Sequence, residues 1–223
     1  MVKPNGLNQT IWRVIYINSK FLDLPKEKQQ KIINAGFEVF SKCEYKRAST
    51  EEIASIAGIS KGLLFYYFHD KKTFYTFLFE QAFDKMKAYV ADERLKTIND
   101  FFELCAYASE RKYNLLLDSP YIMDFFIRAF YAQKDTTPED VQKKMINETE
   151  EVFFNYFQHI AFGKFRDDVN PKEIFHMLIW MADGYMHERQ RAEQMIGLNE
   201  LMDKFRLWSS YLKRISYKEE FLK

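Results

Sequence analysis

The chain has 223 residues, 47% of them hydrophobic, and its 33 lysines and arginines nearly balance its 32 aspartates and glutamates. This composition is typical of a globular protein and excludes a disordered chain. Because no apolar run reaches about 18 residues, we expect no membrane-spanning helix. The N-terminus has only a short apolar stretch and no small-residue cleavage site, so we expect a cytoplasmic protein without a signal peptide. Cys43 and Cys105 form no C-x-x-C motif and are expected to be reduced.

Charge is unevenly distributed along the chain. Residues 1–75 contain 12 lysines and arginines against 7 acidic residues, whereas residues 76–223 contain 21 against 25. A basic N-terminal third beside an acidic remainder indicates that this end of the molecule meets a polyanion.

The positions of glycine and proline, together with the lack of strand-like patterns, predict an all-α fold. Glycine and proline are scarce, with seven and five in the whole chain, and most stand where a helix would begin or end. No strand-like alternation persists, and no Asn-Gly or Asp-Gly hairpin turn occurs. Helices are expected over about 25–43, 50–57, 61–68 and 71–90, three within 92–132 with breaks near Glu110 and at 118–120, then one after Thr137, one after Asn170 and one over about 198–215.

The lengths of these helices suggest two parts. The first three are short enough to form a compact three-helix unit, and the longer ones that follow are typical of a bundle. We therefore predict an N-terminal domain over residues 25–70 and a helical-bundle domain over residues 71–223, with residues 1–24 as an extension of unassigned role.

The segment STEEIASIAGISKGLLFYYFHDKK, residues 49–72, joins two short helical patterns at a glycine. Thr50 is expected to cap the first helix, Gly58 to end it with a positive φ, and Ser60 to cap the second. This is the spacing of a helix-turn-helix, whose second helix places its N-terminal residues in the major groove of DNA. The tip of that helix would be Ser60, Lys61 and Gly62.

The second short helix divides its side chains between two faces. Leu64 and Phe68 are four residues apart and are expected to face the core, which leaves Phe65, Tyr66 and Tyr67 for the outer and flanking faces. A tyrosine hydroxyl at the edge of a groove can donate to a DNA phosphate.

Glycine and leucine at the tip also fit a DNA contact. Gly62 costs about 1 kcal/mol of helix propensity relative to alanine, which is understandable if DNA approaches the backbone closely. Leu63 can contact a thymine methyl group.

Four basic residues flank this unit. Lys71 and Lys72 begin the next helix, where backbone N–H groups also favour an anion, although a solvated face is the alternative. Lys46 and Arg47 precede the first short helix. For these two residues, a contact with a DNA phosphate and the absence of any role in DNA binding are equally compatible with the sequence.

The sequence IASIAGISKGLLFYYFHDKKTFY resembles the DNA-binding signature of the TetR family of transcriptional regulators. The preceding KQQKIINAGFEVFSKCEYKRAST resembles that family's first helix and the loop after it. The resemblance covers roughly residues 26–75. It implies a homodimer in which each subunit has a helix-turn-helix DNA-binding domain and a helical ligand-binding and dimerisation domain, and which usually represses transcription until a small molecule binds.

Residue by residue, the resemblance implies that Thr50 and Lys71 contact DNA phosphates. It implies that Lys61, Gly62 and Leu63, at the tip of the second helix, read the bases. Tyr66 and Tyr67 match residues that contact the DNA backbone and bases. Phe65 stands where the family often has tyrosine, and Leu63 where threonine is common, which indicates a different operator preference. With the flanking basic residues, the expected DNA-binding set is Lys46, Arg47, Thr50, Ser60, Lys61, Gly62, Leu63, Tyr66, Tyr67 and Lys71.

The larger domain is rich in aromatic residues, as in YIMDFFIRAFYA (121–132) and EVFFNYF (151–157). The resemblance implies a pocket there for a small, mostly apolar or cationic effector, and we take Tyr107, Tyr121 and Phe125 as candidates to line it. Ordinary core packing is the alternative for each of them, because aromatic residues at helical spacing usually form core.

The helix expected after Asn170 has two distinct faces. His176, Asp183 and His187 share one, which suggests a metal site, but a solvated or dimer-edge face is favoured and no metal is expected. The opposite face carries an apolar stripe. The resemblance implies that this stripe joins the helix after Thr137 in a four-helix dimer interface, and its residues are Ile174, Met177, Leu178, Met181 and Tyr185.

No H-E-x-x-H, G-x-S-x-G, G-x-G-x-x-G or P-loop motif occurs, so we expect neither an enzyme nor a cofactor. The favoured hypothesis is a ligand-responsive repressor whose partners are double-stranded operator DNA, an effector of unknown identity and a second copy of the chain, with no membrane. A helical enzyme or carrier is one alternative. An adaptor that kept the helix-turn-helix but lost DNA binding is another, for which Phe65 is the slight hint.

Overall fold

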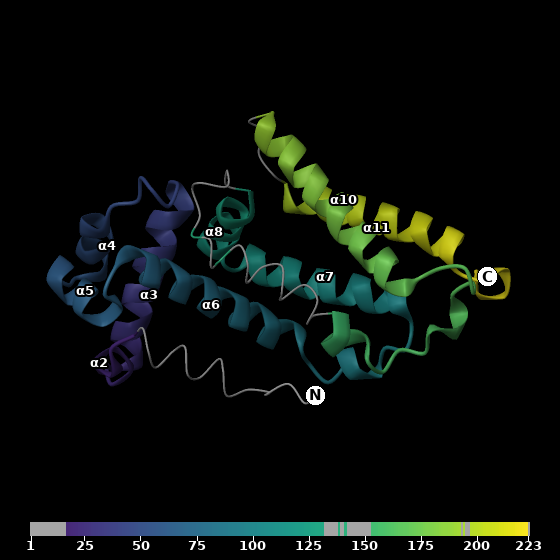
Figure 1. Cartoon of the computed structure of the whole chain (residues 1–223), viewed down its shortest axis with the longest axis horizontal. Helices are drawn as coiled ribbons and strands as arrows, with labels where there is room; N and C mark the ends of the chain where they lie inside the picture. Colours follow the sequence, from purple (N-terminus) through teal and green to yellow (C-terminus); the bar gives the residue numbers. More distant parts are fainter. Residues whose placement is uncertain are drawn as a thin grey trace. The chain divides into compact units, whose positions relative to one another are not determined.

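The computed structural model describes residues 17–131, 138, 141, 153–192, 194 and 197–222. Within these ranges every regular element is a helix, apart from an isolated bridge between Phe165 and Tyr217 (Figure 1). The all-α prediction is therefore confirmed. No described helix is both long and apolar enough to cross a lipid bilayer. Contacts divide the chain into a first unit, Met1–Phe83 with Tyr121–Gln142, and a second unit, Asp84–Pro120 with Lys143–Lys223.

The helices of the first unit follow the predicted ranges closely. Helix α6 continues into the second unit, so one unbroken helix is shared by both. In chain order the helices are α2 (Ser19–Leu22), α3 (Lys26–Lys42), α4 (Thr50–Ala57), α5 (Lys61–Phe68), α6 (Lys71–Val90) and α8 (Pro120–Tyr131).

An aromatic cluster forms the centre of the first unit. The ring centroid of Phe68 lies 4.7 Å from that of Phe21, 4.6 Å from that of Phe74 and 5.2 Å from that of Phe77. Pairs of this kind contribute about 0.5–1.5 kcal/mol each beyond the area they bury. Phe21 is only 1% exposed. Phe21, from the N-terminal extension for which the sequence suggested no role, therefore belongs to this core.

Helices α3 and α6 approach closely at Gly36. A Cβ atom at this position would lie 2.5 Å from Cδ1 of Leu78 and 2.7 Å from Cζ of Phe74. Both of those side chains are fully buried. The helix interior therefore holds a glycine because a side chain would occupy the space already filled by α6.

The second unit contains two long helices that pack against each other, α10 (Pro171–Arg191) and α11 (Leu198–Ser216), with α7 (Phe101–Leu117) packed on α11. Short 3₁₀ turns η1 (Leu95–Thr97), η2 (Phe162–Lys164) and η3 (Glu219–Phe221) complete the described elements, with helical residues at 153–157. Within 92–131 the structure has α7, α8 and the turn η1, and α7 runs through Glu110, so the predicted break there is wrong. The helix expected after Thr137 lies largely outside the described residues.

Asp100 fixes the start of α7. Its Oδ1 accepts hydrogen bonds from the N–H groups of Phe102 (3.0 Å) and Glu103 (3.1 Å). Its Oδ2 accepts from Nζ of Lys164 (2.8 Å) and from the hydroxyl of Tyr217 (3.1 Å). This half-buried carboxylate is therefore fully partnered, as buried charges require.

Candidate nucleic-acid interface

Helices α4 and α5 are joined by a tight turn that requires a glycine. Gly58 has φ +70° in the left-handed region, and no atom lies within 4 Å of a Cβ built there, so conformation and not crowding selects the residue. The N–H of Ile59 then donates to the carbonyl oxygen of Ala54 (3.0 Å). Ser60 caps α5 as predicted, since its Oγ accepts from the N–H of Leu63 (3.1 Å).

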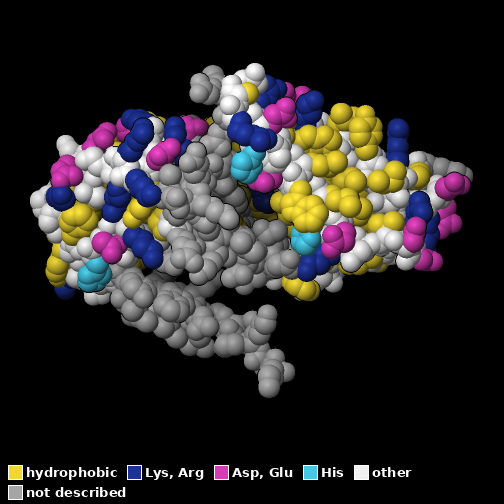
Figure 2. Space-filling view, turned by 45° about the horizontal axis from the view of Figure 1, so that its top comes forward, with side chains coloured by type: hydrophobic (Ala, Val, Ile, Leu, Met, Phe, Trp, Pro, Cys, Tyr) yellow, Lys and Arg dark blue, Asp and Glu magenta, His cyan; other side chains and the backbone are white. Residues whose placement is uncertain are grey.

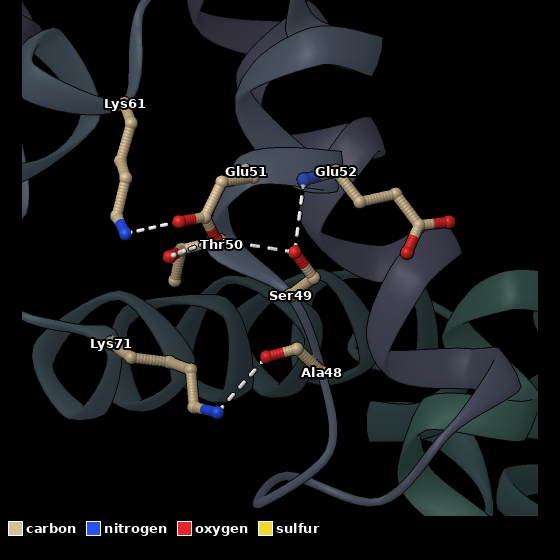
Figure 3. Close-up of polar contacts among 7 residues, drawn as sticks. All are labelled: Ala48, Ser49, Thr50, Glu51, Glu52, Lys61 and Lys71. Atoms are coloured by element: carbon tan, nitrogen blue, oxygen red, sulfur yellow. Dashed lines mark hydrogen bonds and ion pairs between the residues drawn. The ribbon is translucent and has the colours of Figure 1, made fainter.

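The N-cap of α4 is Ser49, so the prediction that Thr50 caps this helix is wrong. The Oγ of Ser49 accepts a hydrogen bond from the N–H of Glu52 (3.3 Å), whereas Thr50 is the first helical residue and is buried (Figure 3). Serine with glutamate three residues later has the spacing of a capping box. A phosphate contact by Thr50 itself stays a prediction.

The tip of α5 is open to a partner. Lys61 and Gly62 are exposed and Leu63 is half-buried. A Cβ at Gly62 would meet only Oγ of Ser60, at 3.9 Å, so the glycine leaves the backbone uncovered. One turn later Tyr66 is 52% exposed. These residues form the slim outer edge that the sequence analysis assigned to a DNA groove.

The inner face of α5 carries Leu64, Tyr67 and Phe68. Leu64 and Phe68 face the core as predicted, but Tyr67 is only 6% exposed, so its expected place on an outer face is wrong. Its ring packs 5.7 Å from that of Phe21, and its carbonyl oxygen accepts from the N–H of Asn18 (2.9 Å). Tyr67 therefore binds the N-terminal segment to the helix-turn-helix, and a DNA contact by it stays a prediction.

Lys61 is paired in the free protein. Its Nζ donates to Oε1 of Glu51 in the first turn of α4 (Figure 3) and lies 5.7 Å from the ring centroid of Phe65. The hydrogen bond from Lys61, with a further one from the backbone N–H of Glu51 itself, lowers the pKa of Glu51 to about 2. Because both side chains are exposed, the pair adds little to stability, and a phosphate can replace the carboxylate.

Lys71 fixes the loop between α3 and α4. Its Nζ donates to the carbonyl oxygen of Ala48 (3.0 Å; Figure 3). It also donates to the carbonyl oxygen of Lys46 (3.1 Å) and lies 4.9 Å from the ring centroid of Tyr45. Its partial burial lowers the pKa of Lys71 below the ordinary lysine value. Lys46 and Arg47 are exposed in the same loop. Lys71 thus positions both the basic loop and the start of α4, a role that sequence spacing did not reveal.

Comparison with known proteins shows which family this unit is similar to. Residues 32–75 match the family model described as bacterial regulatory proteins, tetR family. The helix-turn-helix unit is therefore similar to that of the TetR family of bacterial regulatory proteins. A comparison with curated proteins finds no match.

Solved structures extend the TetR-family fold over most of the chain. A TetR family transcriptional regulator from Chloroflexus aurantiacus is 18% identical, covers 92% of this chain and 100% of its own, and has a TM-score of 0.63. SmeT, the repressor of the Stenotrophomonas maltophilia multidrug efflux pump SmeDEF, is 14% identical, covers 85% and 90%, and scores 0.66. FadR from Bacillus subtilis, solved in complex with stearoyl-CoA, is 17% identical, covers 83% and 98%, and scores 0.60. The chain therefore has the fold of a TetR-family transcriptional regulator.

The three effector candidates lie in different surroundings in this TetR-family fold. Phe125 is 0% exposed, with its ring 4.9 Å from that of Tyr75, so it belongs to the core of the first unit. Tyr121 is exposed beside Lys42. Tyr107 belongs to the second unit, where its hydroxyl donates to the carboxylate of Asp92. A pocket role for these three residues stays a prediction.

The predicted apolar stripe on α10 is split between core and surface. Ile174 and Leu178 are buried in the second unit, and Tyr185 is half-buried. The exposed apolar residues lie on both α10 and α11, and Figure 2 shows hydrophobic side chains gathered on this side of the second unit. The name α10–α11 apolar face is used below for Met177, Trp180, Met181, Leu207, Tyr211 and Ile215.

The histidine row on α10 lies along the same helix. The ring of His176 stacks on that of Trp180 at 5.6 Å, and Nδ1 of His187 lies 3.5 Å from a carboxylate oxygen of Asp183. Among the described residues, no three His, Cys, Asp or Glu side chains are grouped so that they could hold a metal ion.

Proposed function

We propose that this protein is a cytoplasmic, homodimeric transcriptional repressor that binds a palindromic operator and is released by a small effector. The observation that carries the proposal is the open tip of α5, where Lys61 and the uncovered backbone of Gly62 stand next to the exposed Tyr66. A tip of this kind can enter the major groove of DNA while the flanking basic residues contact phosphates. The match of residues 32–75 to the TetR-family model supports this reading.

We propose that residues 25–70 bind the operator, and that residues 71–223 bind the effector and form the dimer. Helix α6 begins one residue after Asp70 and continues to Val90, so it belongs to both compact units. A ligand that prefers one arrangement of the second unit can shift the population of DNA-binding states through this helix. Figure 1 allows the continuous course of α6 to be followed.

The α10–α11 apolar face supports the proposed dimer. Trp180 is 59% and Ile215 is 60% exposed, and large clustered apolar side chains on a soluble protein mark a surface that a partner covers. A two-fold interface is self-complementary, so the same helix pair from a second copy can cover it as a four-helix arrangement. The helix expected after Thr137 is not needed for this version of the interface.

The proposed function predicts salt-dependent binding of the purified protein to DNA from the region upstream of its own gene. The measurement is fluorescence anisotropy with a labelled fragment, repeated across a salt series, since phosphate contacts make affinity fall steeply with salt. Footprinting should show two half-sites about 34–36 Å apart, one for each recognition helix of the dimer. Failure to bind this fragment, and every other genomic fragment in a selection, would contradict the proposal.

The proposed interface predicts that a charge on the α10–α11 apolar face separates the dimer. The double variant Trp180→Glu with Ile215→Glu should sediment as a monomer in analytical ultracentrifugation, because association would bury unpaired carboxylates. Leu117→Glu is the matched control, since Leu117 is 53% exposed in the same unit but lies on α7. A double variant that remains a dimer would place the interface elsewhere.

A further inference from the structure

The carboxylate of Glu51 links α4 to α5, and three side chains hold it in place. Its Oε1 accepts a hydrogen bond from Nζ of Lys61. Its Oε2 accepts from the hydroxyls of Ser49 (3.3 Å) and Thr50 (3.4 Å). Figure 3 shows this carboxylate pointing toward Lys61 from the first turn of α4. The donors around Glu51 therefore come from both parts of the helix-turn-helix.

These donors are also ones that DNA is expected to use. Lys61 is the first residue of α5, at the tip that the proposed function places in the major groove, and Thr50 is expected to contact a phosphate. A carboxylate and a phosphate accept hydrogen bonds from the same ammonium and hydroxyl donors. Glu51 therefore occupies, with its own negative charge, donors that a DNA phosphate would otherwise use.

Two groups keep the ammonium group of Lys61 close to the protein surface. Its Nζ donates to Glu51 and lies 5.7 Å from the ring centroid of Phe65. The side chains of Lys61 and Glu51 nevertheless remain 47% and 64% exposed, so DNA can reach both. The hydrogen bond from Lys61 lowers the pKa of Glu51 to about 2, so the competing carboxylate stays charged at neutral pH.

The neighbouring acid, Glu52, is oriented differently. Its backbone N–H donates to Ser49, and Figure 3 shows its carboxylate pointing away from Lys61. Both acids are exposed in the first turn of α4. Of the two, Glu51 is the one that contacts the lysine at the tip of α5. The effect of this contact can therefore be separated from the effect of a negative charge alone.

We infer that Glu51 is a specificity-determining residue, whose carboxylate competes with DNA phosphates for Lys61 and weakens binding to non-operator DNA more than binding to the operator. This inference rests on the proposed function. Phosphate contacts supply nearly all of the affinity for non-operator DNA. There, Lys61 gains a phosphate only by giving up Glu51, and the released carboxylate then faces a polyanion. On the operator, base contacts by the tip of α5 offset this loss. A penalty against the wrong partner is one way in which proteins gain specificity.

The test is Glu51→Gln, which removes the charge and keeps the size of the side chain. Fluorescence anisotropy measures the affinity of the full chain for the operator fragment and for a fragment of the same length with a shuffled sequence. The variant should bind the shuffled fragment about two- to fivefold more tightly, and the operator by less than about twofold, since an exposed ion pair has effects of this size. The ratio of the two affinities should therefore fall. On the shuffled fragment, the slope of the logarithm of affinity against the logarithm of salt concentration should steepen by up to about one unit, because the freed Lys61 displaces a cation from DNA.

Glu52→Gln is the matched control, since it removes the same charge from the same turn of α4. It should raise both affinities by the same small factor and leave their ratio unchanged. A double-mutant cycle with Lys61→Met tests whether Glu51 acts through the lysine. In the Lys61→Met background, Glu51→Gln should no longer lower the ratio, because no ammonium group remains to be released. Thermal unfolding checks that each variant is folded at the temperature of the binding assay.

Three results would overturn the inference: an unchanged affinity ratio in Glu51→Gln, an equal fall of the ratio in Glu52→Gln, or an undiminished fall in the Lys61→Met background. The proposed function is tested separately with wild-type protein. If wild-type protein prefers no genomic fragment over shuffled DNA, the proposed function is contradicted. Selective binding by wild-type protein, together with an unchanged ratio in Glu51→Gln, would contradict this inference and leave the proposed function intact.

Discussion

Replacing Gly36 by alanine is expected to destabilise the first unit by about 1–3 kcal/mol, the usual cost of forcing an extra methyl group into a packed core. Alanine would normally favour a helix interior by about 1 kcal/mol over glycine. Here the new Cβ would lie 2.5 Å from Leu78 and 2.7 Å from Phe74. Both side chains are fully buried, so neither can swing aside into solvent. Urea unfolding followed by circular dichroism measures the change.

Gly62→Ala is the matched control for Gly36→Ala. The same methyl group at Gly62 would meet only Ser60 Oγ, at 3.9 Å, so stability should stay the same or rise by up to about 1 kcal/mol. Its affinity for operator DNA should nevertheless fall, because the methyl group covers the tip of α5. Equal stability of Gly36→Ala and wild type would show that α3 and α6 tolerate a wider separation than the structure gives.

Lys71→Met is expected to weaken binding to all DNA sequences by about tenfold or more, since a hydrogen bond that involves a charged group contributes about 1.5–3 kcal/mol. The ammonium group holds the carbonyl oxygens of Lys46 and Ala48, so its loss frees the basic loop and the start of α4. The remaining ammonium proton can also donate to a phosphate. The slope of the logarithm of DNA affinity against the logarithm of salt concentration should therefore become shallower by about one unit.

The control for Lys71→Met is Lys31→Met, which removes the same charge from an exposed pair with Glu27 on α3. Its operator affinity should change little, because surface pairs of this kind contribute little. A Lys71→Met variant with unchanged affinity and slope would show that Lys71 neither positions the loop nor touches DNA. Reduced affinity with an unchanged slope would leave only the positioning role.

Much of the DNA-binding unit could be predicted from local sequence signals, and the cap of α4 shows where finer use of them was possible. Ser49 and Thr50 are adjacent residues that can both cap a helix. Only Ser49 has a glutamate three residues later, Glu52, which is the spacing of a capping box, and Ser49 is the N-cap in the structure. The information needed to choose between them was therefore present in the sequence.

Tyr67 illustrates a limit of a different kind. The sequence analysis placed it on an outer or flanking face, although its spacing of three residues from Leu64 is also compatible with the inner face of α5. Its partner Phe21, however, comes from a segment 46 residues earlier in the chain. Helical periodicity describes only local faces, so it could not show that the segment before α3 returns to cover this tyrosine.

The expected helix break near Glu110 is wrong, since α7 is continuous from Phe101 to Leu117. The split of the α10 stripe into buried and exposed residues depends on packing against α11, which no local pattern of α10 reports.

Phe21 has a consequence for the boundaries of the DNA-binding domain. The family match begins at residue 32, yet the ring of Phe21 fills the space against Tyr67 and Phe68. A fragment cut to the matched residues would leave these two aromatic rings uncovered at the back of the recognition helix. The packed core of the first unit therefore begins before the region that matches the family model.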